Sequence, residues 1–217
     1  MMNHNFCKFS ALIFFIIISF NSFSQVINSK YPFDKWTATE INAANTAKSV
    51  NYLTQDEKNV IFFMNLARIN GKLFAQTYAQ KYMDSTKQKK NNYVTTLIST
   101  LKSQKDLKPL IPMEEICSIA KKYAYKMGQE GSTGHKESNK RFATLKTGFT
   151  SRGENCDYGF SDPLAIVMDL LIDEGISDYG HRNNILDKEF NFIGVAIQPH
   201  KKYKVNCVMD FICVEKK

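Results

Sequence analysis

Four titratable side chains in the C-terminal half of this sequence have the composition of a metal or acid–base site. His135 and His181 each follow a glycine directly, and Glu154 and Glu174 each stand next to one. Glycine and short polar residues are typical of turns, where side chains from distant segments converge. Two imidazoles with two carboxylates suit binding of a divalent metal or general acid–base chemistry.

Each member of this set also has a purely structural interpretation. His135 follows the end of an expected helix, a position that is favourable for histidine. Glu154 would serve equally well as a loop anchor that accepts backbone amides. Arg182 would pair with Asp178 or Asp187 in a simple turn. Only convergence in the fold separates a site from a set of loop residues.

The elements that must position these residues are helical in the first half of the chain. Thr54-Gln55-Asp56-Glu57 has the form of a capping box, so we expect a helix that begins at Thr54 and ends at Gly71. The later helices are expected over 73–83, 93–101 and 113–129, and from Ser161-Asp162-Pro163 to Gly175, with Ser161 as the cap.

The C-terminal part is rich in β-forming residues. Phe192–Gln198 and Tyr203–Val214 are expected to be strands, joined by a hairpin loop over Pro199–Lys202 that contains His200. Gly153–Asp157 is a candidate third strand. Helices followed by such a sheet predict an α+β layered domain.

The first residues have the pattern of a signal peptide. Lys8 supplies a positive start, and the apolar run Ala11–Phe20 is shorter than the about 20 residues that span a bilayer. An uncleaved anchor is the alternative. The expected organisation is a signal peptide over 1–24, a lead-in with one short helix over 25–53, and one domain over 54–217. We therefore expect a secreted or periplasmic protein without a stable membrane anchor.

The charge of the chain is positive but dispersed. Removing residues 1–24 takes away one lysine and no acid, so the balance falls from +8 to 28 − 21 = +7. The densest basic patch is Lys87–Lys90, which we interpret as a solvated loop and not as a nucleic-acid surface. We expect a monomer that does not bind nucleic acid.

Four cysteines follow the expected signal peptide. Cys207 and Cys213 lie on one expected strand, too far apart to pair with each other. The open options are 117–207 with 156–213, 117–213 with 156–207, or four free thiols. Cys156 beside Glu154 also raises a Cys–His nucleophile, but a strand thiol in an exported protein is more often oxidised or buried.

Several motifs in order carry a family resemblance over 54–215. The motifs are Asn65-Leu66-Ala67-Arg68, Gly134-His135, Gly153-Glu154-Asn155, Gly180-His181-Arg182-Asn183-Asn184-Ile185-Leu186 and Gly194-Val195-Ala196. The chain resembles the bacterial branch of the CAP superfamily, which comprises cysteine-rich secretory proteins, antigen 5 and pathogenesis-related 1 and is also called the SCP domain. The resemblance implies an α-β-α sandwich whose central cleft is lined by His135, Glu154, Glu174 and His181, with Asp173 competing for the place of Glu174.

The resemblance implies a binding or interaction module more than an enzyme. We expect its cleft to hold a divalent metal, Zn²⁺ best of all, or a small polar ligand, with a small molecule, a protein or a cell-envelope component as partner. Metal binding should be lost below neutral pH, because imidazole must be neutral to ligate and has an unperturbed pKa of about 6.5.

Two alternatives stay open. The first is a metal-assisted hydrolase of peptides or cell-wall material, with Glu154 or Glu174 as the general base, although no established hydrolase motif is present. The second is a carrier of an apolar ligand, with Phe62, Phe63 and Phe74 lining a groove. Aromatic residues at helical spacing are more often core.

Overall fold

The structure is a computed structural model that describes residues 34–215 of the 217. The expected signal peptide and the first part of the lead-in lie outside these residues. Within residues 34–215, no helix has the length and apolar character needed to cross a membrane.

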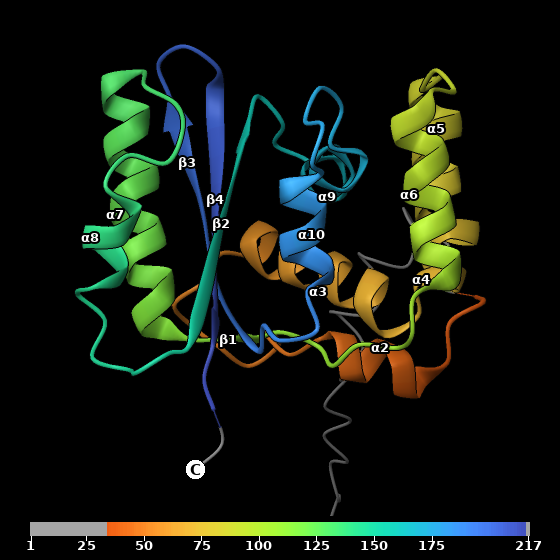
Figure 1. The fold of residues 1–217 in the computed structure, drawn as a ribbon, viewed down its shortest axis with the longest axis horizontal. Helices are drawn as coiled ribbons and strands as arrows, with labels where there is room; N and C mark the ends of the chain where they lie inside the picture. The colour runs from red at the N-terminus through yellow and green to blue at the C-terminus, as the bar shows by residue number, and fades with distance from the viewer. Residues whose placement is uncertain (1–33, 216–217) are drawn as a thin grey trace, which may run out of the picture. The chain divides into compact units, whose positions relative to one another are not determined.

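The described residues form three layers, helix, sheet and helix (Figure 1). The middle layer is a four-stranded sheet in the order β1-β3-β4-β2, antiparallel except for the β1–β3 pair. Its strands are β1 (Ile111–Pro112), β2 (Ser151–Tyr158), β3 (Phe192–His200) and β4 (Lys204–Cys213). The predicted α+β sandwich is therefore confirmed, and β2 is an edge strand.

One face of the sheet is covered by α7 (Glu114–Glu130), with α8 (Ser138–Phe142) beside it (Figure 1). The remaining helices belong to the other side. They are α2 (Ala38–Ala44), α3 (Gln55–Ile69), α4 (Gly71–Phe74), a π-helical turn (Ala75–Ala79), α5 (Gln80–Thr86), α6 (Asn92–Ser103), α9 (Pro163–Ile172) and α10 (Gly180–Leu186).

The predicted start of α3 is confirmed. The Thr54 hydroxyl accepts the amide of Glu57, and the Glu57 carboxylate accepts the amide of Thr54. The helix ends at Ile69, and the side chain of the next residue, Asn70, caps α4, so Gly71 opens the next helix and does not simply end the first. The capping box thus determines where α3 begins, whereas its C-terminal end is set by the junction with α4.

The start and end of α9 differ from the prediction in a way that matters for the cleft. Its cap is Asp162, which accepts the amides of Leu164 and Ala165, and not Ser161. The helix ends at Ile172 because Asp173 adopts the left-handed conformation, φ 58°, two residues before Gly175. The chain therefore turns at Asp173.

Two buried polar residues of α3 tie the helix to loops, as their structural interpretation predicts. Asn65 bonds through its side chain to the backbone of Ala44 and of Leu110. Arg68 is fully buried, and burial lowers its pKa to about 10. Its guanidinium donates to the carbonyls of Lys108, Ile185, Asp187 and Phe190.

The close packing of α7 on the sheet depends on a glycine. A Cβ at Gly194 would lie 2.4 Å from the backbone carbon of Ile116, so only glycine lets the helix approach β3 this closely. The aromatic residues Phe62, Phe63 and Phe74 are buried in the core.

One expectation about the C-terminal strands needs correction, and one open question about the cysteines is answered. His200 is not in a hairpin loop, since β3 extends through it and its ring is buried with Nε2 2.8 Å from the carbonyl of Ser132. No disulfide forms among the described cysteines. Cys117, Cys156, Cys207 and Cys213 are all free, which is the third of the options above.

Candidate functional site

His135 lies on a loop that follows α7 and is held by two tyrosines. The hydroxyl of Tyr123 donates to the carbonyl of Gly134 at 2.6 Å and accepts the amide of Lys136 at 2.8 Å. The hydroxyl of Tyr158 accepts the amide of Gly134 at 2.8 Å. The backbone on both sides of His135 is therefore fixed, although its side chain is 47% exposed.

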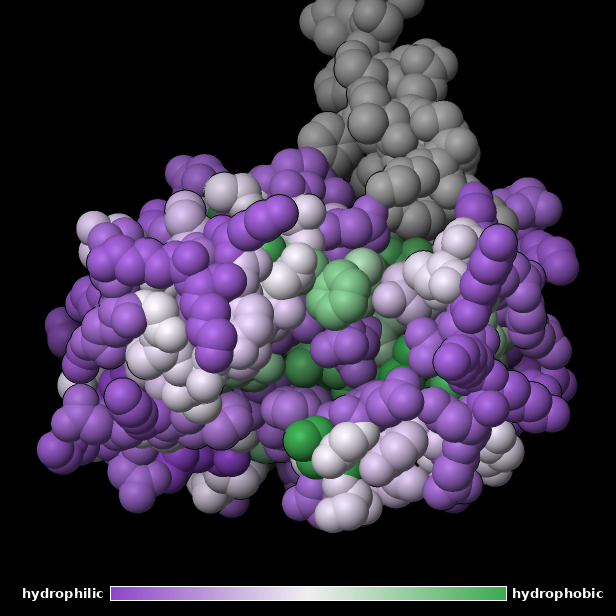
Figure 2. Space-filling model, turned by 90° about the horizontal axis from the view of Figure 1, so that it is seen from above, coloured by the Kyte–Doolittle hydropathy of each residue, from purple (hydrophilic) through white to green (hydrophobic). Residues whose placement is uncertain are grey.

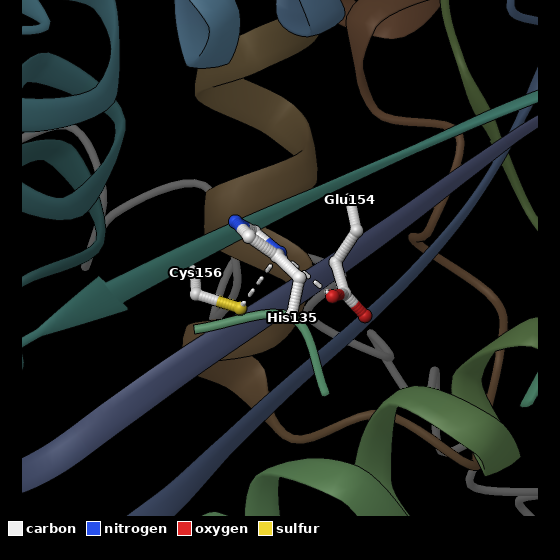
Figure 3. A group of neighbouring side chains, drawn as sticks. All are labelled: His135, Glu154 and Cys156. Carbon is white, nitrogen blue, oxygen red and sulfur yellow. Dashed lines mark hydrogen bonds and ion pairs between the residues drawn. The ribbon is translucent and has the colours of Figure 1, made fainter. Parts of the chain in front are cut away.

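Glu154 reaches His135 from the edge strand β2 (Figure 3). Its Oε1 lies 2.8 Å from Nδ1 of His135 and accepts Nη2 of Arg141 at 2.9 Å, while Oε2 lies 2.5 Å from Nη1 of Arg141. Burial by itself would raise the pKa of Glu154, but the hydrogen bonds from His135 and Arg141 outweigh it and lower the pKa. Glu154 is thus an ionised, 3% exposed side chain that orients His135.

His181 has a carboxylate partner of the same kind in Asp173. Oδ1 of Asp173 lies 2.7 Å from Nδ1 of His181, and Oδ2 accepts the amides of His181 and Arg182 at 2.9 and 3.1 Å. Glu174 instead accepts from Asn91 at 3.0 Å. Glu174 lines the cleft but contacts neither histidine, and the carboxylate that bonds to His181 is Asp173, which is therefore the fourth member of the converging set.

The two imidazoles share one cleft, and their ring centroids lie 6.4 Å apart at 38°. Within the described residues, the Nε2 atom of neither ring has a hydrogen-bond partner. The cleft has a volume of about 370 Å³. Its lining includes Cys156, Asp157, Tyr158, Asp169, Leu170, Asp173, Glu174 and Ile176 besides the two histidines.

A second grouping involves the other nitrogen of His135. The ligand atoms of His135, Glu154 and Cys156 lie within 4.8 Å of one another (Figure 3). Nδ1 is already bonded to Glu154, and Glu154 to Arg141. Burial and the charge of Glu154 raise the pKa of the Cys156 thiol well above its ordinary value, which disfavours the thiolate that a metal ligand or nucleophile needs. This trio fits a metal poorly.

Arg182 does not form the expected ion pair with Asp178 or Asp187 in a simple turn. Its side chain is buried and pairs with neither Asp178 nor Asp187. The guanidinium donates to the carbonyls of Leu171, Ile172 and Tyr93 and to the hydroxyl of Thr96. Arg182 therefore anchors the start of α10, which carries His181.

Sequence reasoning missed Arg141 and the aspartates Asp157 and Asp169. Arg141 lies over the ring of Tyr123, with Cζ 3.5 Å from the centroid, and no local signal marks it. Burial and then the nearby charge of Asp169 raise the pKa of Asp157 to about 8. Asp157 lies on the face of β2 opposite Glu154, and no local signal in the sequence marks it as a site residue.

The family model described as CAP, cysteine-rich secretory protein family, matches residues 95–214. No curated protein matches the chain. Similar solved structures include an outer surface protein from Borrelia burgdorferi, with 18% identity and a TM-score of 0.43 over 50% of this chain. They also include an extracellular protein containing an SCP domain from Bacillus anthracis, with 23% identity and a TM-score of 0.43 over 60% of this chain.

A third similar structure is a cysteine-rich secretory protein from Staphylococcus aureus, with 17% identity and a TM-score of 0.40 over 56% of this chain. The matched region spans 80% of the Borrelia protein. It spans 43% of the Bacillus protein and 38% of the Staphylococcus protein, so it corresponds to less than half of either.

Proposed function

The chain belongs to the cysteine-rich secretory protein (CAP) family, and we propose that it is an exported binding module whose cleft takes a divalent cation between His135 and His181. Zn²⁺ is the cation that suits two imidazoles best, and a small polar ligand would use the same atoms. One observation carries the proposal: the two rings share a cleft, each with Nδ1 held by a buried carboxylate.

The carboxylate partners give both histidines the tautomer that a metal requires. A neutral imidazole that donates Nδ1–H to a carboxylate keeps the lone pair on Nε2, and metal-binding histidines are usually oriented in this way. Glu154 performs this role for His135, and Asp173 performs it for His181. The residues present therefore fit a cation at the two Nε2 atoms.

The separation of the rings predicts modest affinity. With Zn–N distances of about 2.0–2.1 Å in a tetrahedral site, two imidazole centroids lie about 5 Å apart. The observed separation is 6.4 Å, so the rings must approach each other on binding. His135 lies on a loop, and His181 lies two residues after Tyr179, which has the left-handed conformation and precedes α10. Bringing the two rings together therefore costs part of the binding energy.

The structure favours binding over hydrolysis or apolar transport. A bound cation would supply Lewis-acid chemistry. Of the two expected general bases, Glu154 is buried against Arg141 and Glu174 is bonded to Asn91. On the face seen in Figure 2, hydrophobic residues show only as small areas among hydrophilic ones. The lining of the cleft contains three aspartates and a glutamate beside the two histidines, which suits a polar ligand.

Calorimetric titration with Zn²⁺ tests the proposal. We expect one binding event for the purified protein and none for His135→Ala/His181→Ala. The double variant should stay folded, because Glu154 keeps Arg141 and Asp173 keeps two backbone amides. Glu174→Gln is the matched control and should bind like the wild type. Unchanged affinity in the double variant would contradict the proposal.

A further inference from the structure

The two carboxylates that orient the histidines have no free face for a cation. The side chain of Glu154 is 3% exposed and that of Asp173 is 1% exposed. Both oxygens of Asp173 already accept hydrogen bonds, and both oxygens of Glu154 lie against Arg141. A cation at the two Nε2 atoms therefore needs an oxygen ligand from another residue.

Three further carboxyl groups line the same cleft: Asp157, Asp169 and Glu174. Glu174 is bonded to Asn91 and Gln88. Both oxygens of Asp157 are buried. Asp169 is exposed and lies in the last turn of α9, where its backbone carbonyl accepts the amide of Asp173 at 2.8 Å. Asp169 and His181 line the same cleft.

We propose that Asp169 supplies the third protein ligand of the cation, which makes the set two histidines and one carboxylate. This inference rests on the proposed function and names a residue outside the converging set of His135, Glu154, Asp173 and His181. Two imidazoles with one carboxylate are a recurring set for Zn²⁺ and for other divalent metals, and they leave open positions for water or a ligand.

Asp157 is the residue that holds Asp169 in place. Asp157 lies on β2, lines the same cleft and has both side-chain oxygens buried. The side chains of Asp157 and Asp169 interact, and a hydrogen bond between two carboxyl groups needs a proton on one of them. Ligating carboxylates are commonly supported by such a hydrogen bond, which leaves the exposed member, Asp169, available to ligate.

The three ligands must draw together when a cation binds. Within the described residues, His135, Glu154 and Cys156 are the only group of three or more such side chains whose ligand atoms lie within 4.8 Å of one another. Asp169 and His135 lie on exposed positions of separate elements, so side-chain rotation can bring them together. We therefore expect a shift of side chains in the cleft, with the sheet unchanged.

Zn²⁺ titration of Asp169→Asn tests the assignment. We expect this variant to bind at least about 10-fold more weakly than the wild type, because a neutral amide is a poor zinc ligand. Glu174→Gln, an exposed carboxylate of the same cleft, should change the affinity less than about 2-fold. Asp157→Asn keeps a donor to Asp169 and should bind nearly as well as the wild type.

The outcomes separate this inference from the proposed function. If His135→Ala/His181→Ala loses binding but Asp169→Asn keeps it, the inference is wrong and the proposed function stands. If neither variant changes the affinity, both are wrong. A crystal soaked in Zn²⁺ gives a second readout: an anomalous peak within about 2.2 Å of an Asp169 oxygen supports the assignment, and a peak on the histidines alone contradicts it.

Discussion

Oδ1 of Asp173 lies 2.7 Å from Nδ1 of His181, and the same side chain accepts the amides that open α10. One residue therefore ends α9, begins α10 and sets the tautomer of a cleft histidine. Its neighbour Glu174 makes none of these contacts. This difference between adjacent carboxylates gives a direct test of the site.

Asp173→Asn should weaken both the cleft and the fold. Asparagine offers one acceptor oxygen where three donors converge, so we expect a loss of about 1–3 kcal/mol in the free energy of unfolding. Zinc affinity should fall about 10–100-fold, the usual effect of losing a supporting carboxylate. Urea denaturation and calorimetry measure the two effects. Glu174→Gln is the control, and equal effects of the two substitutions would contradict this role of Asp173.

Arg141→Met should leave a buried carboxylate without its main partner. We expect a loss of about 2–4 kcal/mol in the free energy of unfolding and a higher pKa of Glu154. Adding Glu154→Gln to Arg141→Met should recover part of that loss, because it removes the unpaired charge. Thermal unfolding of both variants measures this, with the exposed neighbour substitution Lys140→Met as control. Failure of the double variant to recover any stability would contradict the ion-pair interpretation.

Asp157→Asn should stabilise the protein as the pH rises. The folded pKa of about 8 is above the unfolded value of about 3.9, so wild-type stability falls between these two pH values as the unfolded chain releases a proton that the fold retains. The advantage of the variant should be small near pH 4 and should grow up to about pH 8, by at most about 1.4 kcal/mol for each pH unit.

Denaturation series across this pH range measure that effect. Asp169 shares the proton, so the transition belongs to the pair. Asp106→Asn, at an exposed loop position, should show no such trend. An advantage of Asp157→Asn that does not depend on pH would contradict the assignment of the proton.

The four cysteines within the described residues should be reduced in the native protein and should react slowly with thiol reagents. Cys117, Cys156 and Cys207 are buried, and burial raises the pKa of each thiol. A thiol reagent should therefore label Cys213 first and the others only after unfolding. Peptide mapping without reducing agent checks this, and any cross-link among the four would contradict the structure.

Local patterns predicted the parts of the fold that depend on neighbouring residues. The capping box at Thr54 and Glu57 needs only four residues, and the strands near Val195 and Val208 follow from β-rich runs. The histidines were found because glycine and chemically useful side chains stand next to each other in the sequence.

The rest depends on long-range contacts that no window of sequence contains. Asp173 and Glu174 are adjacent carboxylates in the sequence, and only the structure shows that Asp173 adopts the left-handed conformation and contacts His181. Arg141 meets Glu154 across 13 residues and two elements. Asp157 and Asp169 lie on a strand and a helix, and each looks like an ordinary surface residue in the sequence.

The position of β2 at the sheet edge has a consequence for folding accuracy. Glu154 faces the α7 side with His135, while Asn155, the next residue, faces the other side and bonds to the carbonyl of His181. If the pairing of β2 with β4 slipped by one residue, the side chains of Glu154 and Asn155 would each move to the opposite face of the sheet. Such a protein would keep its secondary structure but lose the cleft. Circular dichroism would not detect such a misfolded form, whereas the zinc titration would.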